Sequence, residues 1–273
     1  GKFHLGGPEN NQAKDSMPSV LGWDYFYGWV GGLPGSNDKT VGGYDKAGTH
    51  MCGFIPGAKL GGTETGACYQ ANGSCTDMTR TSLAEDVVGV QCIEKGGLLV
   101  PNETCSTTLP SYLNFNIENA YYVSPLVIIK DGQTEIVKLS DPRARGYRTT
   151  IETDAAIDWI KSRPAGKPWM ATVSYSSAHT PWQQPPKRLV PLPPKGISPL
   201  DELSCTSAQG GKLDQRIIQD RMIEAMDTEF GRLLVKTGIA KYNEDGSLNY
   251  DPKASNTVIA IVGDNGSLAA AVK

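Results

Sequence analysis

The chain has 273 residues, which is enough to bury one large hydrophobic core. Its 26 basic and 29 acidic residues give a net charge of −3, and no clustered basic stretch argues for a nucleic-acid partner. No apolar run approaches the length of a membrane span, so we expect a globular protein without one.

Cysteine is concentrated in a Gly-rich stretch, residues 36–120, which we interpret as an insertion within a main domain covering 1–273. Its weak hydrophobic periodicity predicts little core of its own, so we expect disulfides to hold it. A zinc site is less favoured, because no CxxC pair occurs and no His lies beside the later cysteines. Disulfides indicate an oxidising compartment, periplasmic or secreted, and their pairing stays open. The six cysteines are Cys52, Cys68, Cys75, Cys92, Cys105 and Cys205.

The next segments alternate between strand and helix patterns. Residues 126–130 and 133–138 flank Asp131-Gly132, which predicts a β-hairpin with a tight turn. Thr153 or Asp154 can cap a short helix that runs through Ile160, before Pro164 stops it. The apolar run 169–174 ends in small polar residues, as a buried strand does when its end opens into a site.

The last part of the chain predicts a long helix followed by a central strand. Apolar residues at helical spacing predict a helix over about 214–235, with Gly238 at its C-terminal boundary. The β-branched run 257–262 is typical of a parallel strand buried on both faces. This alternation predicts an α/β layered domain with a central, mostly parallel sheet. Ligands of such sheets lie beyond the carboxyl ends of the strands.

Chemistry-bearing residues follow both predicted strands. His179 comes after 169–174, where an imidazole suits anion binding or proton donation, and a hydrogen-bonded loop histidine is an equally good interpretation. Asp264 and Asn265 offer the oxygen ligands that Ca²⁺ or Mg²⁺ prefer. Asp-Asn-Gly is also a common turn, but the position after a central strand favours a metal. Lys2 and His4 could aim two cationic donors at one anion, although taken alone they indicate a solvated loop.

Five segments in order resemble motifs of the sulfatase family, within the alkaline phosphatase superfamily. They span nearly the whole chain, and each is modest alone. Gly1-Lys2-Phe3-His4-Leu5-Gly6 resembles Gly-Lys-Trp-His-Leu-Gly, with Phe3 in place of Trp. The others are Gly22–Gly28, Lys167–Pro181, Met226-Asp227 with Gly231-Arg232, and Val262–Gly266.

The resemblance implies an alkaline-phosphatase-like fold and a role for each matching residue. Lys2 would bind sulfate oxygens, and His4 would contact a hydrated aldehyde nucleophile. His179 would bind sulfate or protonate the leaving oxygen. Asp264 and Asn265 would ligate a divalent cation, usually Ca²⁺. Asp227 and Arg232 would support their helix.

The chain also departs from the family pattern. The family's Asp-Asp metal pair and its Cys- or Ser-x-Pro-x-Arg nucleophile motif are both absent. We therefore expect an incomplete domain, inactive by itself, from a parent enzyme that hydrolyses sulfate monoesters of a small molecule or a glycan. A phosphodiesterase or phosphonate hydrolase of the same superfamily, and a non-catalytic anion- or partner-binding protein, remain alternatives. An incomplete sheet would also leave an unpaired edge, through which the chain could associate.

Overall fold

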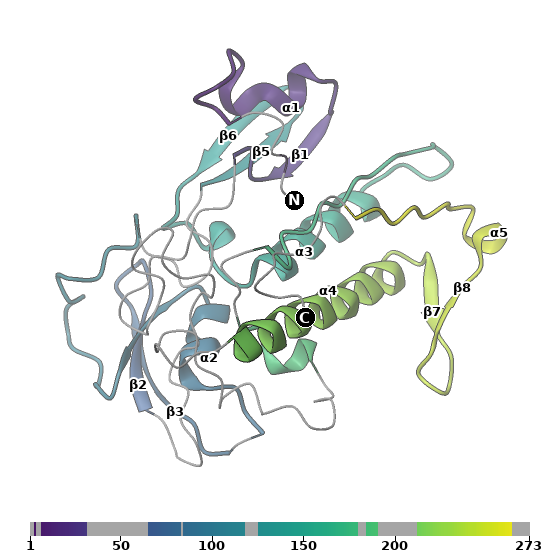
Figure 1. Ribbon diagram of the computed structural model, residues 1–273. Coiled ribbons are helices and arrows are strands. Elements are labelled where there is room, and N and C mark those ends of the chain that lie inside the picture. The colour runs from purple at the N-terminus through teal and green to yellow at the C-terminus, as the bar shows by residue number, and fades with distance from the viewer. Residues whose placement is uncertain are drawn as a thin grey trace.

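The computed structural model describes residues 3, 7–31, 65–82, 84–117, 125–179, 184–190 and 212–263. Within these ranges the chain is mixed α/β, and its three small sheets are all antiparallel (Figure 1). The helices are α1 (Met17–Val20), α2 (Val88–Glu94), α3 (Arg148–Lys161), α4 (Lys212–Lys236) and α5 (Pro252–Ser255), with short 3-10 turns η1 (Lys14–Ser16), η2 (Pro142–Ala144) and η3 (Lys187–Leu189). The strands are β1 (Tyr25–Gly28), β2 (Thr65–Tyr69), β3 (Cys75–Thr79), β4 (Leu98–Pro101), β5 (Leu126–Lys130), β6 (Gln133–Val137), β7 (Ala240–Tyr242) and β8 (Leu248–Tyr250).

The first sheet has the order β1-β5-β6 and contains the predicted hairpin. Lys130 pairs with Gln133 across the two-residue turn, in which Asp131 has φ 52° and Gly132 has φ 75°. Positive φ at both turn residues is the type I′ pattern, whose twist matches that of the flanking strands. The hairpin prediction is confirmed. Leu126 of β5 and Trp29, which follows β1, are fully buried in one cluster.

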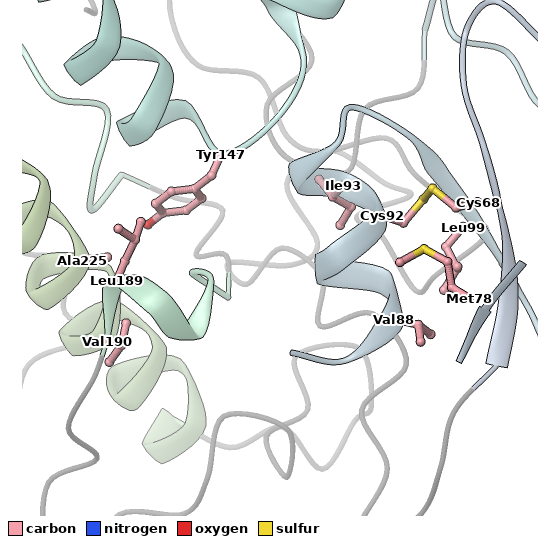
Figure 2. Close-up of a cluster of buried hydrophobic side chains, with 10 residues drawn as sticks. All are labelled: Cys68, Met78, Val88, Cys92, Ile93, Leu99, Tyr147, Leu189, Val190 and Ala225. Atoms are coloured by element: carbon pink, nitrogen blue, oxygen red, sulfur yellow. A yellow bond between two sulfur atoms is a disulfide. The ribbon is translucent and has the colours of Figure 1, made fainter. Parts of the chain in front are cut away.

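The second sheet, β3-β2-β4, packs against α2 and carries two disulfides, Cys68–Cys92 and Cys75–Cys105. Figure 2 shows the first disulfide between β2 and α2, beside Leu99 and Met78. The expectation of disulfides is confirmed for these four cysteines, while Cys52 and Cys205 lie outside the described residues.

The expectation that this stretch has little core is wrong. Tyr69, Leu98 and Phe115 are buried together on one side of the second sheet. Most of the apolar side chains come from short strands separated by turns, so no long periodic run shows them in the sequence.

Helix α3 begins earlier than predicted. It starts at Arg148, and Thr153 and Asp154, the expected caps, lie inside it. The preceding Tyr147 makes no side-chain cap hydrogen bond, so tertiary contacts rather than a capping signal set this start. Ile157 and Ile160 pack with Leu233 and Leu234 of α4, and the two helices lie against each other (Figure 1).

Helix α4 agrees closely with its prediction, since it runs from Lys212 to Lys236. After it, Gly238 has φ 76° and its N–H donates to the Val235 carbonyl, while Ile239 donates to Leu234. This left-handed ending favours glycine, because a Cβ would be strained there. Neither α4 nor any other helix in the described ranges carries an apolar stretch that could cross a bilayer.

The predicted buried strands at 169–174 and 257–262 do not form sheet ladders. Both segments lie among the described residues and pair with no described strand, so the structure gives no support for a central parallel sheet. Val173 and Ile259 pack on the α3–α4 cluster, whereas Met170 is 74% exposed and Val258 is 92% exposed. Most residues of both segments are exposed, although a continuous apolar run predicts a strand that is buried on both faces.

Candidate functional site

Four of the five site residues expected from the sequence, Lys2, His4, Asp264 and Asn265, lie outside the described residues. The fifth, His179, is exposed in the loop that follows 169–175, and its backbone N–H donates to the Ser176 carbonyl at 2.9 Å. This hydrogen bond holds the backbone of the loop at the residue that carries the imidazole. The candidate site is therefore built around the loop of His179.

A buried carboxylate anchors the start of this loop. Glu152 of α3 is 2% exposed, and its carboxylate accepts the Ser176 N–H at 3.0 Å and the Ser176 hydroxyl at 2.5 Å. Burial raises the pKa of Glu152, and the hydrogen bonds from Ser176 and the nearby Arg148 guanidinium oppose that rise. Two hydrogen bonds between the same pair of residues fix both the position and the orientation of Ser176.

Hydroxyl groups surround this anchor. The Thr149 hydroxyl lies 2.7 Å from that of Ser177, and the Thr153 hydroxyl lies 3.1 Å from that of Tyr175. Burial raises the pKa of Tyr147 to about 12, more than the neighbouring Ser177 and Thr149 side chains lower it. The Tyr147 phenol is therefore protonated at neutral pH, and Ser177, two residues before His179, is held by the neutral Thr149 hydroxyl.

The first turn of α3 also contacts Trp29, which binds Phe3 of the N-terminal motif. The Arg148 guanidinium carbon lies 3.4 Å from the centroid of the Trp29 ring, a cation–π contact between two buried side chains. The Trp29 carbonyl accepts the N–H of Phe3 at 2.9 Å, and the Phe3 ring packs edge-on against Phe26. The first turn of α3 thus contacts the His179 loop directly. It is linked through Trp29 to Phe3, the described residue of the Lys2–His4 segment.

A second buried carboxylate joins α3 to α4. Glu229 is fully buried and accepts hydrogen bonds from the Thr150 hydroxyl at 2.8 Å and from Arg232 Nε at 2.5 Å. Arg232 also contacts Asp154 at 2.7 Å, so its supporting role extends across both helices. Asp227, expected to share that role, is exposed on α4.

A third helical element joins this network. Arg188 of η3 lies 3.6 Å from Glu229 and 2.9 Å from Glu94 of α2. The network therefore ties α2, η3 and α4 to the helix that carries Glu152 and holds the His179 loop.

Glu152 and Glu229 are the residues that sequence reasoning missed. The spacing of Glu229 and Arg232, three residues apart on one helix, is a visible signal for an ion pair. Nothing in the sequence marks Glu152, since its partner Ser176 lies 24 residues away.

His179 is exposed on a loop whose backbone is held at Ser176, and an exposed imidazole suits anion binding or proton donation. The described side chains include no group of three or more His, Cys, Asp or Glu residues that could hold a metal ion. No family model, curated protein or solved structure matches the chain.

Proposed function

We propose that this chain is a sulfatase-type part of an enzyme that hydrolyses sulfate monoesters of a small molecule or a glycan. One observation carries the proposal, namely the occurrence of five sulfatase-like motifs in the family's order along the chain. The arrangement around His179 supports it, because the imidazole stands exposed on a loop anchored at Ser176.

In this proposal His179 binds a sulfate oxygen or protonates the leaving oxygen. Lys2 and His4 add cationic donors, which would stabilise the negative charge of the sulfate group. Glu152 and Thr149 act through the loop, since they hold Ser176 and Ser177 rather than the substrate. The two disulfides support a periplasmic or secreted location, where such bonds persist.

The divalent cation of the proposal would be held by Asp264 and Asn265. Both supply oxygen donors, the kind that Ca²⁺ prefers and Mg²⁺ accepts, so the chemistry of the donor set fits the ion. When bound, the cation would supply positive charge to the developing anion.

Calorimetry with Ca²⁺ on the wild type and on the double variant Asp264→Ala/Asn265→Ala tests the metal site. Binding by the wild type that disappears in the double variant is expected. Asp227→Asn is a matched control, because it removes an exposed carboxylate of α4 and should leave Ca²⁺ binding unchanged. Absence of binding in the wild type would contradict the proposed site.

A non-catalytic anion-binding role is the second candidate, and the absence of the Cys- or Ser-x-Pro-x-Arg motif favours it for the chain as it stands. Loss of a nucleophile removes nearly all of an enzyme's rate. We expect no turnover of an aryl sulfate, but binding of inorganic sulfate that weakens in His179→Ala. Steady turnover that vanishes in His179→Ala would contradict the expectation that the chain is inactive and would favour the sulfatase proposal.

A further inference from the structure

Three aromatic side chains from distant parts of the chain gather at the C-terminal end of α3. The Trp159 ring stacks on Tyr25 of β1, with ring centroids 6.1 Å apart and an interplanar angle of 27°. The Trp169 ring stands edge-on to Trp159, at 6.1 Å and 89°. Trp169 is 38% exposed, whereas the other two are half-buried. These three residues, called here the aromatic platform, present to solvent a Trp ring that is held by its contact with Trp159.

A tight turn brings Trp169 back to α3. The Lys167 N–H donates to the Pro164 carbonyl at 3.3 Å, and Gly166 has φ 75°. A glycine with positive φ at the third position of a four-residue turn is the type II pattern, which reverses the chain. Figure 1 shows the chain turning back toward α3 after this helix. The turn therefore places the exposed ring of the platform against the last turn of α3.

Cationic side chains border the platform. Residues 161–167 contain Lys161, Arg163 and Lys167 and no acidic residue, although the whole chain has a net charge of −3. No ion pair joins any of these three cations to a carboxylate in the part of the chain that the structure describes. The acidic residue nearest in sequence, Asp158, is exposed. Three cations without such a counter-charge favour an anionic partner.

The Arg163 guanidinium is already fixed in place. Its central carbon lies 4.3 Å from the centroid of the Trp159 ring. Its Nε donates to the Trp159 carbonyl at 3.1 Å, and its Nη2 donates to the Ser162 hydroxyl at 2.8 Å. Its other terminal nitrogen, Nη1, makes no hydrogen bond to a described residue. Because a fixed arginine loses little freedom on binding, this nitrogen suits an oxygen of a sulfate or carboxylate group.

The combination of an exposed ring, a hydroxyl group and cations matches an anionic polysaccharide. One face of a sugar ring consists of C–H groups that pack on an aromatic ring, while its hydroxyl groups form hydrogen bonds around it. Burial raises the pKa of Tyr25 to about 12, so its phenol is a neutral donor at neutral pH. The Tyr25 hydroxyl makes no hydrogen bond within the described ranges, so it is available to a sugar.

Single-stranded nucleic acid also binds surfaces that combine aromatic and basic side chains. The two disulfides indicate an oxidising compartment outside the cytoplasm, which favours a polysaccharide over a nucleic acid. We infer that the aromatic platform and its three bordering cations, Lys161, Arg163 and Lys167, form a binding site for an anionic polysaccharide.

This site is separate from the His179 loop. Trp159 lies about 15 Å along α3 from Thr149, the residue whose hydroxyl contacts Ser177. Binding at the platform is therefore independent of the proposed hydrolysis, and His179→Ala should leave it unchanged.

Isothermal titration calorimetry of the full 273-residue chain with dextran sulfate and with unmodified dextran tests this inference. We expect dextran sulfate to bind more tightly than dextran. Trp169→Ala and Lys161→Gln/Lys167→Gln should each lower the affinity for dextran sulfate by roughly tenfold or more. Both lysines are exposed, so the fold should survive their replacement. Trp169→Phe keeps an aromatic ring and should retain most of the binding.

Tyr242→Ala and Lys241→Gln/Lys253→Gln are matched controls, because they remove an exposed ring and two exposed cations elsewhere. Both should bind dextran sulfate like the wild type. Absence of binding by the wild type would overturn the inference. Binding that is unchanged in Trp169→Ala would also overturn it, since charge alone would then explain the affinity. Tighter binding of a single-stranded oligothymidine than of dextran sulfate would assign the surface to nucleic acid instead.

Discussion

Asp86 should make the stability of this protein fall as the pH rises toward neutrality. Both oxygens of its carboxylate accept the N–H of Lys187 at 3.1 Å, which ties the segment before α2 to η3. Burial nevertheless raises the pKa of Asp86 from 3.8 to about 6, more than the Lys187 hydrogen bond lowers it. The folded state therefore holds this proton more tightly than the unfolded chain does.

The size of the effect follows from the pKa shift. A shift from 3.8 to about 6 corresponds to about 3 kcal/mol of unfolding free energy. Because the folded-state pKa is raised, this stability is fully present below the unfolded pKa and is lost as the pH rises through the folded pKa. The change Asp86→Asn keeps an acceptor for the Lys187 N–H but removes the charge, and with it the pH dependence.

Urea unfolding of the wild type and Asp86→Asn from about pH 4 to about pH 7 measures this difference. We expect the stability of Asp86→Asn relative to the wild type to increase by about 2 kcal/mol across this range, because it begins just above the unfolded pKa. Asp227→Asn controls for the loss of a carboxylate charge at an exposed position. A difference between Asp86→Asn and wild type that stays flat with pH would refute the reasoning. A difference of opposite sign would mean that the hydrogen bonds outweigh burial.

Two further predictions concern covalent and backbone constraints. Replacing Cys75 and Cys105 together by Ser opens a loop of sequence separation 30, which should lower the free energy of unfolding by about 3–4 kcal/mol. An unchanged urea midpoint would contradict this prediction. Gly238→Ala should cost about 1–2 kcal/mol, since φ is 76° there, whereas Gly263→Ala, with open space around its Cβ position and no positive φ, should be nearly neutral. Equal thermal midpoints for the two glycine variants would count against the left-handed ending of α4.

Elements governed by local signals were predictable from the sequence. The Asp131-Gly132 turn selects a two-residue hairpin, because few other residues accept positive φ at both positions. Helix α4 carries a long apolar face and ends two residues before a glycine, so both its extent and its end could be inferred. In each case the residues that determine the element lie within the element itself.

Elements governed by distant contacts were not predictable. The start of α3 at Arg148 depends on neighbours such as Trp29, far away in the chain, whereas Thr153 and Asp154 gave a misleading capping signal. Likewise, the run at 257–262 has the composition of a central strand, but a strand also needs paired neighbours. The composition of a segment indicates its preference for a strand, but it does not show whether neighbouring strands are present to pair with it.

In the candidate site, too, the local signals were predictable and the distant contacts were not. Those contacts identify α3 as the element on which the site depends. His179 was found from its position after an apolar run, yet the groups that hold its loop all lie in the first two turns of α3. Thr149 contacts Ser177, and Glu152 contacts Ser176. Arg148 contacts the Trp29 ring, and the Thr150 hydroxyl donates to Glu229. One short helical segment therefore connects the N-terminal motif, the His179 loop and α4, so a change there alters the position of His179 without touching it.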